Sequence, residues 1–485
     1  MAANADETNP VFLRSLGNTL QAQQRWDDAL ACYQVALQRD PQYADAYRDL
    51  GAVLLMLGQP VAAEQALRLA VSLAPNVAEN HNNLGVALKN QQRYDEALAC
   101  YQRALALRPD FPDAMFNIGT VHYLRKDAAA AVQRYLRVLA LDPAYARAHQ
   151  NLALIFEESG HLDEAAQHRQ LAFRDHSVFV DPSPAPRRTV LVLWAAGKGN
   201  VPIDHLLPRE HTTLITWMVA YPPSTPLPAY DLVFNAVGDP DVMGPTLAPS
   251  EQFIAQCDKP VLNLPARVAR TSRERLPELF ADIPRVIVPP IERLVRGQVT
   301  PAVLAQYGLI YPLLVRPSGS HGGMYLDKVD DIAALEALVT LHADAYYVSR
   351  FHDYRSSDGY YRKYRIVFVN GQPYPYHLAI SEHWLVHYET AGMQGMAWKQ
   401  AEERRFLEDP TQALGEIAMQ AINAIGQAMS LEYCGVDFSL LPDGRVLVFE
   451  ANATMLVHPE PDDSELAYKN PYVRRILEAF ERMLP

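Results

Sequence analysis

Residues 433–455 read YCGVDFSLLPDGRVLVFEANATM, two apolar runs that flank Pro442-Asp443-Gly444. Apolar runs around a Pro, Asp and Gly turn predict a β-hairpin. If the loop runs from Pro442 to Arg445, Leu441 faces Val446. Counting back along both strands then places Asp437 opposite Glu450. Directly opposed residues on one face lie roughly 5 Å apart.

The polar residues of this hairpin have the chemistry of a cation site. Asn452 lies two residues beyond Glu450 and therefore shares its face. Two carboxylates this close repel unless a cation lies between them. Hard oxygen ligands suit Mg²⁺, whose shell is completed by phosphate and water. We therefore expect a metal site at Asp437, Glu450 and Asn452, the alternative being a hairpin whose acids face solvent.

An Asp on one strand followed by Glu-x-Asn on the next resembles the metal end of the ATP-grasp fold. Further pieces of that fold occur in order upstream, so the resemblance covers Thr189 to Pro485. It implies an α/β (α+β) ATP-grasp module that binds ATP and Mg²⁺ and acts as a carboxylate–amine ligase.

The segment YPLLVRPSGSHGGMYLDKV (residues 311–329) resembles the phosphate-binding loop of the family, because glycines let backbone N–H groups approach phosphate oxygens. The family typically has Lys-Pro where this chain has Arg316-Pro317, which keeps the charge but not the geometry. The resemblance implies nucleotide contacts at Arg316, Ser318, Gly319, Gly322 and Gly323, and a hinge at Arg350 and Phe351. An additional cation is expected from Arg273 or Arg275, and the sequence does not choose between them.

The run Arg365-Ile-Val-Phe-Val-Asn-Gly resembles the glutamate ligases that extend a ribosomal protein's tail, with Lys363 in place of their acid. The resemblance implies that Arg365 clamps the transferring phosphoryl group, with Lys363 beside it. His377 and His387 fall where those ligases place polar residues near the acyl phosphate. Imidazoles can do similar work near neutral pH, and the alternative for each is an ordinary histidine whose hydrogen bonds are satisfied.

Upstream of these stretches lies a smaller α/β pattern. Apolar runs at 189–194, 212–220, 230–239 and 261–265 are separated by gaps of helix length, which predicts strands alternating with helices. This lobe resembles the first lobe of D-alanine–D-alanine ligase-like enzymes. Its glycines, with Asn235, either contact substrate or only form turns.

The first third of the chain is repetitive. Pro41, Pro75, Pro109 and Pro143 recur every 34 residues, and Gly17, Gly51, Gly85 and Gly119 keep the same period. A period of 34 with small residues at fixed places is the tetratricopeptide signature and predicts an α-solenoid of about five helix pairs. We expect repeats over 10–176, a Pro-rich linker over 177–188, a pre-ATP-grasp lobe over 189–270 and nucleotide-binding lobes over 271–485.

One position of the repeats is polar throughout. It holds Asp49, Asn83, Asn117 and Asn151 on the first helix of successive pairs, which form the concave side of such stacks. Amides offer a donor and an acceptor, as a peptide backbone does. The pattern resembles the asparagine ladder of O-linked N-acetylglucosamine transferase repeats. It favours a peptide or protein partner, the alternative being an ordinary exposed polar position.

Composition limits the remaining classes. The 485 residues carry a net charge of −13, which argues against a general nucleic-acid or acidic-membrane partner. Four scattered cysteines indicate neither a zinc site nor disulfides, and the polar N-terminus lacks a signal core, so a cytoplasmic location is expected. Together with these limits, the resemblance implies a ligase that makes an amide bond through an acyl phosphate. The alternatives are a nucleotide-sensing scaffold or phosphoryl transfer without ligation.

Overall fold

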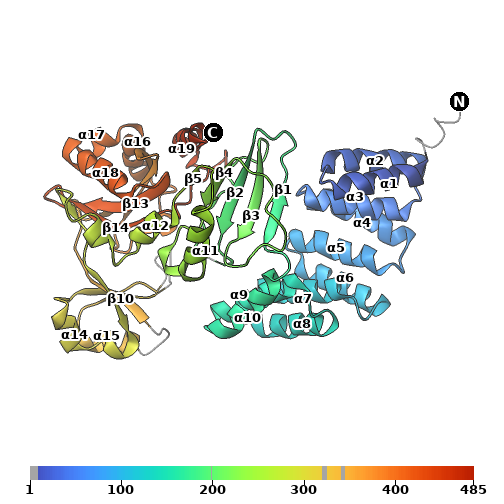
Figure 1. The fold of residues 1–485 in the computed structure, drawn as a ribbon, viewed down its shortest axis with the longest axis horizontal. Helices are drawn as coiled ribbons and strands as arrows, with labels where there is room; N and C mark the ends of the chain where they lie inside the picture. The colour runs from blue at the N-terminus through green and yellow to red at the C-terminus, as the bar shows by residue number, and fades with distance from the viewer. Residues whose placement is uncertain (1–8, 198, 319–324, 340–344, 485) are drawn as a thin grey trace. The chain divides into compact units, whose positions relative to one another are not determined.

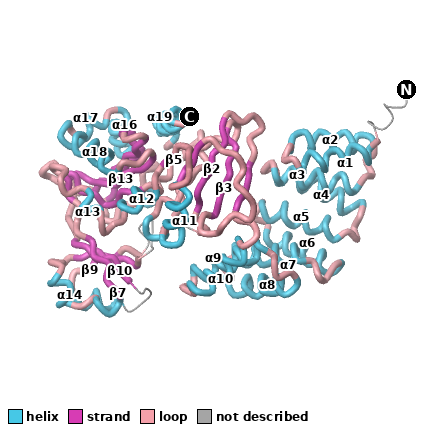
Figure 2. Tube along the Cα trace, viewed as in Figure 1, coloured by secondary structure: helices cyan, strands magenta, loops and turns pink. Residues whose placement is uncertain are grey.

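The computed structural model describes residues 9–197, 199–318, 325–339 and 345–484. Contacts within the chain divide it into two compact units, residues 1–176 and 177–485 (Figure 1). The first is helical, and the second is mixed α/β (Figure 2).

In its described part, the first unit consists of ten helices arranged as five antiparallel pairs. They are α1 Pro10–Ala22, α2 Trp26–Arg39, α3 Ala44–Met56, α4 Pro60–Leu73, α5 Ala78–Asn90, α6 Tyr94–Leu107, α7 Pro112–Leu124, α8 Ala128–Leu141, α9 Ala146–Glu158 and α10 Leu162–Phe173. The first helices of the pairs begin at residues 10, 44, 78, 112 and 146, so the sequence period of 34 is the structural period. The α-solenoid expected from the sequence is confirmed.

The repeated glycines let the two helices of each pair approach closely. A Cβ built on Gly85 would lie 2.5 Å from the ring of Tyr101, and one on Gly119 would lie 2.7 Å from Tyr135. Both tyrosines are fully buried. Tyrosine ring and glycine backbone therefore fill one another's space, and the spacing of the two residue types in the sequence reflects this contact.

The second unit contains three sheets. The first sheet has the order β1-β3-β2-β4-β5, with β1 antiparallel to β3 and the other pairings parallel. Its strands are β1 Val178–Asp181, β2 Arg188–Trp194, β3 Thr212–Met218, β4 Leu232–Asn235 and β5 Val261–Leu262. β1 lies within the segment expected to be a linker. Loops connect β2 to β3 and β3 to β4 in the described residues, where helices were expected, and helix α11 (Gly244–Ile254) precedes β5.

The middle sheet and the third sheet are mainly antiparallel. The middle sheet has the order β7-β10-β8-β9, with strands Ile291–Val295, Ala345–Arg350, Leu313–Pro317 and Asp327–Val329, and the short helices α14 Pro301–Gln306 and α15 Ile332–Val339. The third sheet has the order β12-β11-β13-β14-β6, with strands Gln372–Ser381, Tyr361–Val369, Tyr433–Leu440, Val446–Asn452 and Val286–Ile287.

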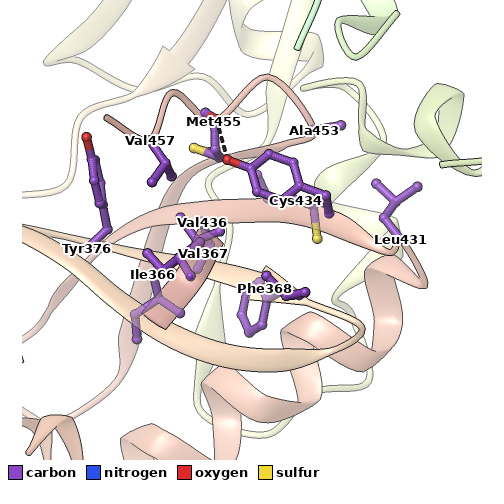
Figure 3. Close-up of a cluster of buried hydrophobic side chains, with 14 of the residues drawn as sticks. Ile366, Val367, Phe368, Tyr376, Leu431, Cys434, Val436, Ala453, Met455 and Val457 are labelled. Carbon is purple, nitrogen blue, oxygen red and sulfur yellow. Dashed lines mark hydrogen bonds between the residues drawn. The ribbon is translucent and has the colours of Figure 1, made fainter. Parts of the chain in front are cut away.

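Helices α16 (Ala397–Glu408), α18 (Glu416–Met429) and α19 (Asn470–Met483) pack on the third sheet, and α17 (Pro410–Leu414) lies between the first two along the chain. Figure 3 shows part of this core, where Ile366 of β11, Val436 of β13 and Met455 lie together. The hydroxyl of Tyr433 donates to the carbonyl of Met455 over 2.7 Å. The core therefore fixes both strands, β13 and β14, of the hairpin that contains Asp437 and Glu450.

The hairpin pairs as expected at its polar end but not at its turn. Asp437 lies opposite Glu450, whereas Leu440, not Leu441, faces Val446. The backbone N–H of Leu441 instead donates to the carbonyl of Arg445 over 2.9 Å, so the loop is residues 442–444, one residue shorter than expected. Gly444, at the end of that loop, takes the left-handed conformation that such a turn requires (φ 81°). A bulge beside Asp437, where Phe449 has no partner, then restores the register.

Candidate functional site

A row of polar side chains crosses the third sheet. His377 of β12 pairs with Arg365 of β11, Arg365 pairs with Asp437 of β13, and Asp437 pairs with Glu450 of β14. Cross-strand partners share a face, and Lys363, two residues before Arg365, shares it too. Four neighbouring strands thus bring together five residues predicted to carry the chemistry.

Asp437 is held by two cations of β11. Arg365 Nη2 donates to its Oδ2 over 2.8 Å, and Lys363 Nζ lies 2.9 Å from the same oxygen. The Asp437 side chain is only 2% exposed. Burial alone would raise the pKa of Asp437, but Arg365 and Lys363 hold that pKa well below its ordinary value. The charge that relieves the repulsion between Asp437 and Glu450 is therefore supplied by the protein itself.

Glu450 is bound by Arg273, whose Nη2 donates to Glu450 Oε1 over 2.7 Å. The amide Nδ2 of Asn452 donates to the same oxygen, over 2.9 Å. The Asn452 Oδ1 accepts instead from the backbone N–H of Thr454. The donor set suits a hard divalent cation in chemistry. Three oxygen ligands would face one cation only after the amide rotates and Arg273 releases Glu450.

The structure distinguishes the two arginines between which the sequence did not choose. Arg273 is buried among Glu450, Asp241 and the ring of Tyr347, while Arg275 is exposed at the start of α13 (Leu276–Leu279). Burial would lower the pKa of Arg273, but Glu450 and Asp241 raise it, so the guanidinium stays charged. Arg273 belongs to the cluster, and Arg275 does not.

Arg316 of β8 lies opposite Tyr347 of β10 in the middle sheet. Burial, followed by the nearby charge of Arg273, lowers the pKa of Arg316. Two guanidinium groups of like charge thus lie near the carboxylate of Glu450. Such a pair favours an anion.

Asp241 and Tyr347 were missed by the sequence reasoning. Asp241 lies in the single-turn helix η1 (Pro240–Val242), just after β4, and accepts hydrogen bonds from Tyr347 Oη (2.7 Å) and Arg273 Nη1 (3.1 Å). Its position just beyond the carboxyl end of a parallel strand was the available signal, because ligands of α/β sheets bind there. The sequence contained no such signal for Tyr347, because this residue reads as an ordinary apolar strand residue.

A small hollow lies beside these groups. It is lined by residues 239–241 of the first sheet's loop, residues 271–273 and residues 450–452. Its cavity volume is only about 10 Å³, far below the roughly 300–1,000 Å³ of ligand pockets. A ligand of ordinary size would therefore enter only if this region opened.

The two predicted histidines differ in their surroundings. His377 is buried, stacks on Tyr388 with centroids 4.6 Å apart, and its Nε2 has no hydrogen-bond partner among the described residues. Burial and the charge of Arg365 lower the pKa of His377 far below its ordinary value, so the ring is neutral. His387 is half-buried on the loop that precedes Tyr388. A buried lysine, Lys469, lies 4.1 Å from the Tyr388 ring and was not foreseen.

The other residues predicted to bind nucleotide lie at or just after the ends of strands, or outside the described residues. Ser318 donates its backbone N–H to the carbonyl of Ala345, and Phe351 donates its own to Pro312. The Arg350 side chain is exposed at the end of β10. Gly319, Gly322 and Gly323 lie outside the described residues.

The side chains at the polar position of the repeats form hydrogen bonds or ion pairs within the repeats themselves. Asp49 pairs with Arg14 over 2.6 Å, and Asn117 is buried and donates to Asn82. Asn151 donates to the hydroxyl of Tyr135 over 2.9 Å. Asn83 is half-buried and accepts from Asn82. The row is thus less open than an exposed ladder of amides.

The described residues set two further limits on the site and its setting. Every helix among them is too short or too polar to span a lipid bilayer. They also contain no group of three or more His, Cys, Asp or Glu side chains arranged to hold a metal ion. The candidate cation site therefore depends on two carboxylates and an amide.

Comparison with known families finds tetratricopeptide repeats. A profile described as "Tetratricopeptide repeat" matches residues 82–145, and one described as "TPR repeat" matches residues 6–58. The chain therefore carries tetratricopeptide repeats, and both matched segments lie within the first unit. No curated protein matches the sequence.

Among solved structures, similar chains include MamA, with 28% identity over 32% of this chain and 91% of that one, and a TM-score of 0.29. A thermophilic repeat protein of Thermus thermophilus has 26% identity over 34% of this chain and 89% of that one, with a TM-score of 0.31. The first repeat domain of Spaghetti, bound to an HSP90 peptide, has 24% identity over 24% of this chain and 94% of that one, with a TM-score of 0.24.

Proposed function

We propose that residues 189–485 form an ATP-grasp module that joins a carboxylate to an amine at the expense of ATP, and that the repeats recruit a peptide or protein. The observation that carries the proposal is the pairing of Asp437 with Glu450, with Asn452 beside them and the cations Arg365, Lys363 and Arg273 in contact. Mixed charges of this kind suit a metal-bound triphosphate.

In the proposed reaction, a carboxylate oxygen of the first substrate attacks the γ-phosphorus of ATP, and the bond from that phosphorus to the β–γ bridging oxygen breaks. The amine nitrogen of the second substrate then attacks the acyl carbon, and phosphate leaves with the amine's proton. Asp437, Glu450 and Asn452 would hold Mg²⁺, which when bound neutralises charge on the phosphates.

The chain's own cations would do the rest. Arg365 and Lys363 are fixed by Asp437 and so are oriented before substrate binds, which makes their electrostatic stabilisation of the transferred group effective. Arg273 and Arg316 would bind the phosphates. His377 is neutral and buried beside Arg365, so it adds no competing charge.

The repeats would bind an extended segment along the first helices of the pairs. Lys89 of α5 supports a partner that carries acidic groups. Burial and the like charge of Arg147 lower its pKa, so a carboxylate placed there would relieve the repulsion. Binding of acidic peptides by the intact chain, weakened by salt and by Lys89→Gln, would support this role.

The ligase proposal is tested by incubating the protein with ATP, Mg²⁺ and pooled amino acids or peptides and measuring ADP and product mass. We expect ADP release, a product lighter than its two substrates by one water, and loss of both in Glu450→Ala. Arg275→Gln is the matched control and should retain activity. An added phosphate without loss of water would instead indicate a kinase.

A second candidate is a scaffold that binds nucleotide without turnover. It is favoured by the internal pairing of Asp437 and Glu450, whose charges are already balanced by Arg365, Lys363 and Arg273. Tight binding of ATP without ADP release, across all substrates offered, would support it.

A further inference from the structure

The carboxylate of Asp241, which is not one of the predicted site residues, accepts hydrogen bonds from both Arg273 and Tyr347. It connects three parts of the second unit: its own loop after β4, Arg273 from the segment that follows η2 (Ala269–Thr271), and Tyr347 of the middle sheet. Through Arg273 it reaches Glu450 of the third sheet. One side chain therefore joins elements from all three sheets beside the hollow.

The local fold holds Asp241 firmly in place. The side chain of Asp239 caps η1 by accepting from the backbone N–H of Asp241 over 2.9 Å, and Pro240 starts the turn. The carbonyl of Gly199 accepts from the N–H groups of Gly238 and Asp239, both over 3.0 Å. Gly199 has φ 86°, and a Cβ there would lie 2.3 Å from Val242, so this close packing requires glycine.

We propose that Asp241 is a positioning residue for the ATP site, which places the Arg273 guanidinium for the nucleotide phosphates and ties the middle sheet to the metal-binding carboxylates through Tyr347. The proposal rests on the proposed function for its nucleotide. The geometry supports it, because Arg273 uses separate nitrogens for Asp241 (Nη1) and Glu450 (Nη2) and Asp241 uses separate oxygens for Arg273 and Tyr347. If the Glu450 carboxylate releases Arg273 to bind a metal ion, Asp241 still holds the Arg273 guanidinium in place.

The test measures the affinity of the full chain for a non-hydrolysable ATP analogue with Mg²⁺, by calorimetry. We expect Asp241→Asn and Tyr347→Phe each to weaken binding about 10-fold, the loss typical of one hydrogen bond to a charged group. In an Arg273→Gln background, Asp241→Asn should have little further effect, because it acts through Arg273. Arg275→Gln is the matched control and should bind as the wild type does.

The proposal would be overturned if Asp241→Asn weakened nucleotide binding equally in the wild-type and Arg273→Gln backgrounds. It would also be overturned if Asp241→Asn and Tyr347→Phe left the affinity for nucleotide unchanged. The ligand-free protein gives a second measurement. Midpoints of urea unfolding for Asp241→Asn, Tyr347→Phe and the double variant should be non-additive. If the wild type binds no nucleotide, the proposed function fails, while additivity of those midpoints still decides whether Asp241 couples the sheets.

Discussion

At the scale of residues, the site is governed by the compensation of buried charge. Asp437 is almost fully buried and is tolerated there because Arg365 and Lys363 bind both of its oxygens. Removing a single partner from such a set is costly, because the remaining charges stay buried without compensation. This asymmetry leads to the first prediction.

Asp437→Asn should destabilise the second unit by about 3–5 kcal/mol, because Arg365 and Lys363 would be left as buried like charges. Asp443→Asn, in the exposed turn of the same hairpin, is the matched control and should change stability little, since its partner Arg445 is also exposed. Urea unfolding followed by circular dichroism measures both. Equal destabilisation by the two variants would show that the hairpin, not the buried charge, sets the cost.

Asn263 provides a second residue-scale prediction. Its side chain pairs with Tyr433 as a strand would, accepting from the backbone N–H over 2.9 Å and donating to the carbonyl over 2.8 Å. Asn263→Ala leaves both buried groups unpaired and should cost about 2–4 kcal/mol. Asn370, on an exposed turn, has a similar positive φ (49° against 55°), so Asn370→Ala measures the backbone term alone. If both variants cost the same, the side-chain pairing contributes nothing.

A pair of histidines in the repeats predicts a pH dependence. His149 Nδ1 lies 2.7 Å from His168 Nδ1, and burial followed by His149 lowers the pKa of His168. A lowered folded-state pKa means that the unfolded chain takes up the proton first, so stability is complete above about pH 6.5 and falls as the pH drops below it. We expect a loss of roughly 0.5–1 kcal/mol between pH 7 and 5, discounted because His168 is partly exposed. His168→Gln should flatten that slope, and an unchanged slope would contradict the assignment.

At the scale of elements, the repeats show what periodicity alone can predict. The 34-residue spacing predicted the helix pairs, and the recurring glycines lie where the two helices of a pair approach closely. The hairpin strands β13 and β14 and the pairing of Asp437 with Glu450 were also predictable, because their apolar runs and turn residues lie next to each other in the chain. The shorter turn and the bulge were not, because each shifts the register by one residue and the two shifts cancel.

Gly85→Ala tests the contact within a pair. The new methyl group would overlap the ring of Tyr101, which is fully buried and cannot move aside, so a loss of about 1–3 kcal/mol is expected. In a Tyr101→Ala background the same substitution should cost much less, because the space is then open. A thermodynamic cycle measured by urea unfolding gives the difference. An identical cost in both backgrounds would mean that helix geometry, not the ring, requires glycine.

At the scale of the whole molecule, the predictable contacts are those close in sequence or periodic, and the unpredictable ones join distant elements. Tyr347 and Asp241 are 106 residues apart, and Arg273 and Glu450 are 177 apart. No local pattern encodes such pairs, since the two partners lie far apart in the chain even where one of them is recognisable as a site residue. The choice of Arg273 over Arg275 became possible only when the fold brought Arg273 to Glu450 and left its neighbour exposed.

The division into two units, each with buried clusters of its own, predicts two unfolding events. In a calorimetric scan of the full chain, Gly85→Ala should lower the midpoint of one transition and Asp437→Asn that of the other, because each change perturbs a different core. Substitutions without shared partners add in free energy, so the double variant should show both shifts unchanged. Mg²⁺ with an inert ATP analogue should raise only the transition that Asp437→Asn lowers, since ligands stabilise the unit that binds them. A single transition that responds to both substitutions and to nucleotide would instead make the chain one cooperative body, and binding of a partner by the repeats would then be coupled to the reaction proposed for the second unit.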